Sequence, residues 1–148
     1  MTMPEKGQRL PDVEFTTESG EKLAADDLTG EKTVLYFYPK DDTPGCTKEA
    51  CSFRDRMTDY EEAGLRVYGV SLDSPESHRR FREKHNLNFP LLTDEEGRAS
   101  EALGVLGGRG TPNRVTFLLG ANGTIARVYP EVSPETHADE ILEDAAAL

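Results

Sequence analysis

The residues of this chain most able to do chemistry are its two cysteines, Cys46 and Cys51. Before them, residues 33–38 form an apolar, β-prone run that predicts a buried strand. After Cys46, residues 47–63 predict a helix. Most lone cysteines are inert core residues. A cysteine at the junction of a strand and a helix is instead placed for reaction, so the pattern predicts a reactive thiol.

The predicted start of the helix explains why Cys46 would be reactive. Thr43 is a favourable N-cap and Pro44 suits the first helical position, which places Cys46 in the first turn. Unpaired N–H groups and the helix dipole favour an anion there. A cysteine with an ordinary pKa of about 8.5 is only a few per cent thiolate at neutral pH, but this setting with a neighbouring cation lowers such values to about 3.5–7.5. We therefore expect a nucleophilic thiolate.

The composition indicates one globular domain over residues 1–148, large enough for a core without disulfides. Hydrophobic residues make up 36% of the chain and charged residues 30%. No apolar run approaches the roughly 18 residues of a membrane span, and the first residues lack the apolar core of a signal peptide. We therefore expect a cytoplasmic protein, where two cysteines favour catalysis or redox sensing over cross-linking.

The charge balance limits the classes of partner. The formal net charge is −11, because 28 acidic residues outnumber 17 basic ones. This balance argues against binding to nucleic acid, which requires basic patches, and against anionic membrane surfaces. It fits high solubility, and a salt-rich cytoplasm is the more specific interpretation.

Apolar periodicity predicts alternating strands and helices. The predicted strands are 13–17, 21–23, 33–38, 65–72, 90–93, 115–119 and 124–129, and the predicted helices are 47–63, one opened by Ser74, 99–103, and one opened by Ser133 with Ile141, Leu142, Ala145 and Leu148 facing inward. Alternation of this kind requires parallel crossovers, and the last two strands add an antiparallel edge. We expect a three-layer α/β domain with a central mixed sheet and an N-terminal hairpin.

The order of these elements resembles the thioredoxin fold, and residues 39–51 resemble the peroxiredoxins, specifically their Q-type or bacterioferritin-comigratory-protein subfamily. The family signature is a proline, three residues, a threonine, two residues and a cysteine. It stands here as Pro39, Thr43 and Cys46. A second cysteine five positions on, here Cys51, marks the subfamily.

The resemblance implies a thiol peroxidase for hydrogen peroxide and organic hydroperoxides, with Cys46 as the peroxidatic cysteine. Its thiolate would attack a peroxide oxygen and become a sulfenic acid. Thr43 would hydrogen-bond the sulfur or the peroxide, or use its oxygen on a backbone N–H as an N-cap. Pro39 would shield the thiolate from water.

The resemblance also supplies a cation. Arg114, directly before the strand 115–119, matches the family arginine that would stabilise the thiolate and polarise the peroxide. Glu49 would orient Arg114. Arg109, in a shortened loop over 104–113, is the alternative arginine.

Cys51 poses a geometric problem. Helical residues five apart have Cα atoms ~8.6 Å apart, whereas a disulfide needs about 7 Å or less. Cys46 and Cys51 therefore cannot join while the helix is intact. The resemblance implies that they do form an intramolecular disulfide, which thioredoxin or a similar dithiol then reduces. It also suggests a monomer or a weak dimer. We expect no cofactor and no metal.

Three other interpretations stay open. A thiol–disulfide oxidoreductase of the thioredoxin fold would want a Cys-x-x-Cys motif, whereas four residues separate these cysteines. A metal carrier would need further soft ligands or a histidine beside the cysteines, and the three histidines have no zinc-ligand spacing. A holdase without chemistry would leave the combined signature unexplained.

Overall fold

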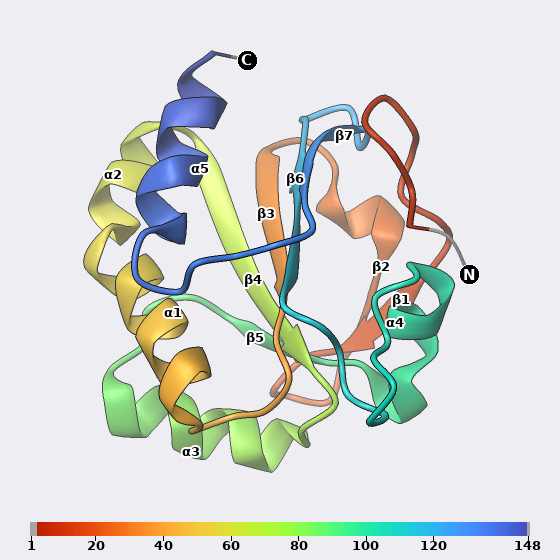
Figure 1. Cartoon of the computed structure of the whole chain (residues 1–148), viewed down its shortest axis with the longest axis vertical. Helices are drawn as coiled ribbons and strands as arrows, with labels where there is room; N and C mark the ends of the chain where they lie inside the picture. The colour runs from red at the N-terminus through yellow and green to blue at the C-terminus, as the bar shows by residue number, and fades with distance from the viewer. Residues whose placement is uncertain (1–2, 148) are drawn as a thin grey trace.

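A computed structural model describes residues 3–147 of the chain. Its centre is a seven-stranded sheet in the order β2-β1-β5-β4-β3-β6-β7 (Figure 1). The strands are β1 (Glu14–Thr16), β2 (Lys22–Ala24), β3 (Lys32–Phe37), β4 (Leu65–Ser71), β5 (Leu91–Thr93), β6 (Val115–Leu119) and β7 (Ile125–Tyr129). The helices are α1 (Pro44–Asp55), α2 (Met57–Glu62), α3 (Pro75–His85), α4 (Arg98–Ala102) and α5 (His137–Ala146), with 3₁₀ turns at Ala25–Leu28 and Glu95–Gly97.

The sheet is mixed, as the alternation of elements predicts. Strands β3, β4 and β5 run parallel, joined by crossovers through α1–α2 and through α3. Strand β6 is antiparallel to β3, and β7 is antiparallel to β6. The expected N-terminal hairpin forms as β1 and β2, with Phe15 opposite Leu23.

The three layers follow from the alternation of side chains on β3. Val34 and Tyr36 point into the core beneath α1, α3 and α5, whereas Leu35 and Phe37 point into a second core beneath α4 and the 3₁₀ turn at Ala25–Leu28. Both faces of the central strand are therefore buried, which is why it reads as a continuous apolar run. Figure 1 shows the larger helices on one side of the sheet and α4 on the other.

The predicted helix over 47–63 is wrong in one respect, because the structure has two helices there. The break lies at Arg56, whose backbone has φ −106° and ψ 6°. Its N–H bonds the carbonyl of Phe53, three residues back, so the ladder tightens and α1 ends. No proline or glycine marks this break in the sequence. Gly64 ends the second helix as predicted, with a positive φ of 72°.

The final helix also differs from its prediction. Ser133 does not open α5: its carbonyl accepts the N–H groups of Thr136 and His137 in a preceding turn, and α5 begins at His137. Ile141 and Ala145 are buried as predicted, and Leu142 packs against the core. Leu148, also predicted to face inward, lies outside the described residues. Over residues 3–147, no helix combines the length and apolarity needed to cross a membrane.

Candidate active site

The register of β3 and β6 brings the arginine to the cysteine. Phe37, the last residue of β3, lies opposite Val115, the first of β6. Arg114 therefore precedes β6 at the point where the chain leaves β3 for the loop into α1. Two segments nearly 70 residues apart meet at one end of the sheet because an antiparallel pair places the end of one strand beside the start of the other.

Cys46 lies in the first turn of α1, as predicted, and only 2% of its surface is exposed. The Nη2 group of Arg114 donates to its Sγ at 3.4 Å. A Cβ atom on Gly45 would come within 3.0 Å of the same Nη2, so the glycine leaves room for the guanidinium. The buried sulfur thus faces both a helix N-terminus and a permanent cation, two features that attract an anion.

Glu49 fixes the other side of the guanidinium. Its Oε1 accepts from Arg114 Nη1 at 2.8 Å, and the side chain is fully buried. Burial raises the pKa of Glu49 to about 7, although Arg114 acts to lower it. Burial alone would lower the pKa of Arg114, but Glu49 and Cys46 outweigh burial and raise it, so the cation is permanent. A buried Glu49 contrasts with the exposed surface that a helical glutamate usually occupies.

The second carboxylate oxygen, Glu49 Oε2, has no hydrogen-bond partner among residues 3–147, and neither has the buried hydroxyl of Tyr36. Burial, followed by the charges of Glu49 and Cys46, raises the pKa of Tyr36. The Tyr36 ring stacks on Phe53 of α1 at a centroid distance of 4.7 Å. The active site therefore borders a tightly packed aromatic core rather than open solvent.

The other predicted site residues lie on the loop between β3 and α1. Thr43 occupies the N-cap position, but its hydroxyl makes no capping bond and donates to the carbonyl of Lys40 at 2.9 Å. The oxygen of this hydroxyl can still accept a hydrogen bond. Pro39 is half-buried just beyond β3. Arg109 is exposed on a turn, so the arginine that the structure brings to Cys46 is Arg114.

Cys51 lies one and a half turns further along α1, half-buried, and both thiols are free. It lines a groove between α1 and the start of α5. The groove is crossed by an ion pair between Lys48 and Glu135 at 3.3 Å and by a hydrogen bond from Ser52 Oγ to the carbonyl of Glu135. These contacts hold the segment that carries both cysteines in helical form.

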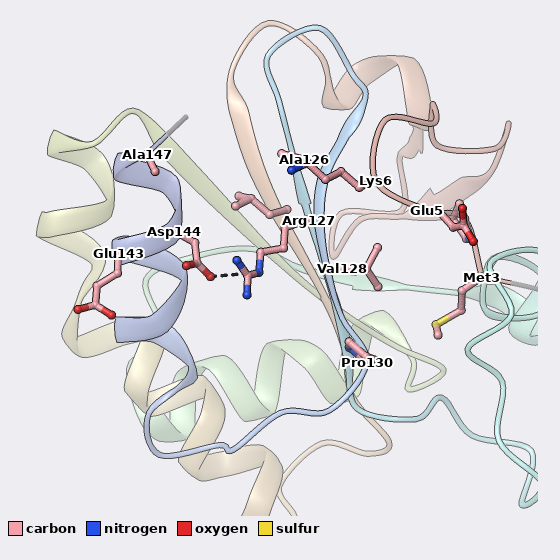
Figure 2. Close-up of a pocket in the computed structure, with 12 residues that line it drawn as sticks. Met3, Glu5, Lys6, Ala126, Arg127, Val128, Pro130, Glu143, Asp144 and Ala147 are labelled. Atoms are coloured by element: carbon pink, nitrogen blue, oxygen red, sulfur yellow. Dashed lines mark ion pairs between the residues drawn. The ribbon is translucent and has the colours of Figure 1, made fainter.

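A second, more apolar pocket lies between β7, α5 and the N-terminal segment, and Figure 2 shows its lining residues with the ion pair between Arg127 and Asp144. It contains none of the five predicted site residues. Within residues 3–147, no group of histidine, cysteine and carboxylate side chains is arranged to hold a metal ion.

Comparison with known proteins places the chain in a family. Residues 6–128 match the model of the AhpC/TSA family. The chain belongs to this family. A putative peroxiredoxin bcp of Coxiella burnetii is 43% identical over 93% of this chain and 96% of its own. The peroxidoxin BcpB of Mycobacterium tuberculosis is 33% identical, with a TM-score of 0.89 over 97% of both chains. The Xanthomonas campestris bacterioferritin comigratory protein, solved in a study of its alkyl peroxide reduction, is 31% identical, with a TM-score of 0.88 over 97% of this chain and 98% of its own.

These relatives confirm the expected family and its thioredoxin-like fold, and they confirm a thiol peroxidase. The thiol–disulfide oxidoreductase alternative gains no support from them. The residues Gly45 and Glu49 complete the constellation around the sulfur. Gly45 stands directly before the cysteine in the sequence. The reason for a glycine there, which is the space taken by the Arg114 guanidinium, is visible only in the structure.

Removing the cation should slow the reaction with peroxide. Arg114→Ala is expected to lower the second-order rate on the order of 10²-fold, the usual loss for one donor that stabilises developing charge. Arg114→Lys should restore only part, because an ammonium lacks the two-sided fork that spans Cys46 and Glu49. Stopped-flow kinetics with hydrogen peroxide measure both. Arg109→Ala is the matched control, and a loss in that variant with none in Arg114→Ala would reverse the assignment.

Glu49 should make stability depend on pH. A raised pKa means that the folded state holds the proton more tightly, so the burial penalty is absent below about pH 4.5 and grows until about pH 7. Glu49→Gln removes this penalty. The free energy of unfolding of the variant, relative to that of wild type, should therefore rise by up to about 3 kcal/mol from pH 4.5 to pH 8. Urea unfolding at the two pH values measures this difference. Glu62→Gln, exposed on α2, is the control. An equal effect of Glu49→Gln at pH 4.5 and at pH 8 would contradict a raised pKa for Glu49 in the folded protein.

Proposed function

We propose that Cys46 is the peroxidatic cysteine of this peroxidase and Cys51 its resolving cysteine. The observation that carries the proposal is the 3.4 Å contact from Arg114 Nη2 to the buried Sγ of Cys46 at the start of α1. The sulfur here is held beside a cation at a helix N-terminus, whereas a core cysteine needs neither of these neighbours.

The first step is attack of the Cys46 thiolate on one peroxide oxygen. The S–O bond forms as the O–O bond breaks, the sulfur becomes a sulfenic acid, and water or an alcohol leaves after taking up a proton. Arg114 stabilises the negative charge as it moves from sulfur to the departing oxygen. The Thr43 hydroxyl already donates a hydrogen bond to the Lys40 carbonyl, so its oxygen can accept a hydrogen bond from the peroxide O–H. Pro39 limits access of water.

The second step joins the two cysteines. Both lie within α1, so the helix must unwind before the Cys51 thiolate can attack the sulfenic acid and release water. The break at Arg56 limits the change, because α2 starts a separate ladder beyond it. Unwinding also requires the loss of the Lys48–Glu135 ion pair, which is exposed and therefore weak.

A dithiol reductant of the thioredoxin type would then reduce the disulfide. A relative studied for alkyl peroxide reduction supports organic hydroperoxides as substrates beside hydrogen peroxide. We further propose that the protein acts as a monomer, since the two cysteines that complete the cycle belong to one helix. A cytoplasmic location is part of the same proposal and rests on the bacterial relatives.

Single replacements of the two cysteines separate their roles. Cys46→Ser should abolish peroxide consumption, because no other thiolate faces Arg114. Cys51→Ser should react once and stop at the sulfenic acid, which dimedone labelling and mass spectrometry detect. Substantial turnover by Cys46→Ser would remove that residue from its role. Full thioredoxin-linked cycling by Cys51→Ser would show that resolution comes from another thiol.

The resolving step should be visible as local unfolding. Hydrogen exchange should show protected amides over 44–55 in the reduced protein and faster exchange there in the disulfide form, since the disulfide cannot fit an intact helix. Residues 57–62 on α2 serve as an internal control and should keep their protection. Equal protection of 44–55 in both redox states would mean that the disulfide forms without unwinding or that these cysteines do not pair.

A further inference from the structure

The loop that carries the peroxidatic signature is held by a buried charged cluster that the reaction itself does not use. At its centre is Asp41, whose side chain is 4% exposed. Its Oδ1 accepts from the hydroxyl of Tyr38 at 2.6 Å. Its Oδ2 lies 2.8 Å from the Ser77 hydroxyl, which donates to it, and 2.8 Å from Nδ1 of His78. Ser77 and His78 are both on α3, across the site from α1.

The partners of His78 determine where its protons lie. Its Nε2 is 2.9 Å from the carbonyl of Leu92, which can only accept, so Nε2 carries a proton. The hydroxyls of Tyr38 and Ser77 already donate to Asp41, one to each carboxylate oxygen. The third contact, from Nδ1, must then be a donation as well. Both ring nitrogens then act as donors, although Nδ1 also lies 3.4 Å from the Tyr38 hydroxyl. The side chains of His78 and Asp41 are 0% and 4% exposed.

The same loop is tied down at the neighbouring positions. The N–H of Asp41 donates to Asp73 at 2.8 Å. Asp42 has a φ of 56°, unusual for a residue with a side chain, and it is held by Lys84 and His85 from the last turn of α3. The segment that ends in Thr43 is thus held by Asp73 and by α3 on one side, and it joins α1 through the Thr43 carbonyl, which accepts from the Thr47 N–H.

We propose that His78 is a positioning residue for the peroxidase reaction, holding the loop of Pro39 and Thr43 over Cys46 through Asp41. This inference rests on the proposed role of Cys46. A buried ion pair is weak evidence for stability, because an apolar pair of similar volume often serves as well. What the pair adds is a unique loop conformation, and a displacement of about 1 Å at a reacting group can lower a rate on the order of 10²-fold.

The test separates positioning from general stability by comparing two reactions of one thiol. In a Cys51→Ser background, the rate of Cys46 with hydrogen peroxide depends on the loop, whereas its rate with iodoacetamide reports only a nucleophilic, accessible thiolate. His78→Gln should lower the peroxide rate at least tenfold and leave the iodoacetamide rate within a few-fold. Asp41→Asn should have the same selective effect.

His137→Gln is the matched control. His137 is also buried and also makes two side-chain hydrogen bonds, to Thr116 and Glu140, but it has no hydrogen bond to the loop. It should reduce stability and leave the ratio of the two rates unchanged. If His78→Gln fails to fold, Ser77→Ala removes one donor to Asp41 from a half-buried position and should lower the ratio by a smaller factor.

A measurement on the reduced protein without a substitution at His78 completes the test. Long-range ¹H–¹⁵N NMR of the ring should show protons on both nitrogens of His78 at neutral pH. A single protonated nitrogen, or a ratio in His78→Gln equal to that in His137→Gln, would overturn the proposal. Failure of the proposed function would look different: the parent protein itself would react no faster with peroxide than with iodoacetamide, whatever the ring shows.

Discussion

The Arg114 guanidinium is the group on which the site depends, because it contacts two buried acceptors at once. On one edge it faces the Cys46 sulfur, and on the other the carboxylate of Glu49. A buried sulfur anion and a buried carboxylate repel each other, and neither has water to stabilise it. The planar fork of arginine contacts both at once, which a point charge cannot do. The pairing of β6 with β3 and the missing side chain at Gly45 both serve to admit this group.

The identity of the elements around this contact could be predicted from local patterns. The apolar run over 33–38, the Thr-Pro pair and the glycine at 64 are short-range signals with direct physical meaning, and they located the strand, the helix start and the helix end. The alternation of strands and helices was enough for the layer order, since parallel strands require crossovers. The arginine was found through family resemblance, because nothing local distinguishes Arg114 from an exposed residue before a strand.

What could not be predicted depends on long-range packing. The end of α1 at Arg56 has no breaker residue, and Phe53, Met57 and Tyr60 on its two sides pack into the same core. The burial of Glu49 and the pairing of His78 with Asp41 depend on tertiary contacts. Arg114 lies 65 positions from Glu49 in the sequence, and His78 lies 37 positions from Asp41. Thr43 was placed correctly as the N-cap residue, but the direction of its hydroxyl was decided by the nearby carbonyl of Lys40.

The separate ladders of α1 and α2 have a consequence for how this enzyme tolerates its own substrate. A helix of 12 residues is marginal by itself in water, so α1 is held chiefly by its packing and its contacts with α5. In the proposed cycle, the lifetime of the sulfenic acid on Cys46 would depend on the equilibrium between wound and unwound α1, and a longer lifetime would give a second peroxide molecule time to react. Substitutions in the exposed pair of Lys48 and Glu135 can shift that equilibrium without touching the sulfur. Resistance to irreversible inactivation would then depend on how firmly α1 packs, with a small contribution from these surface contacts.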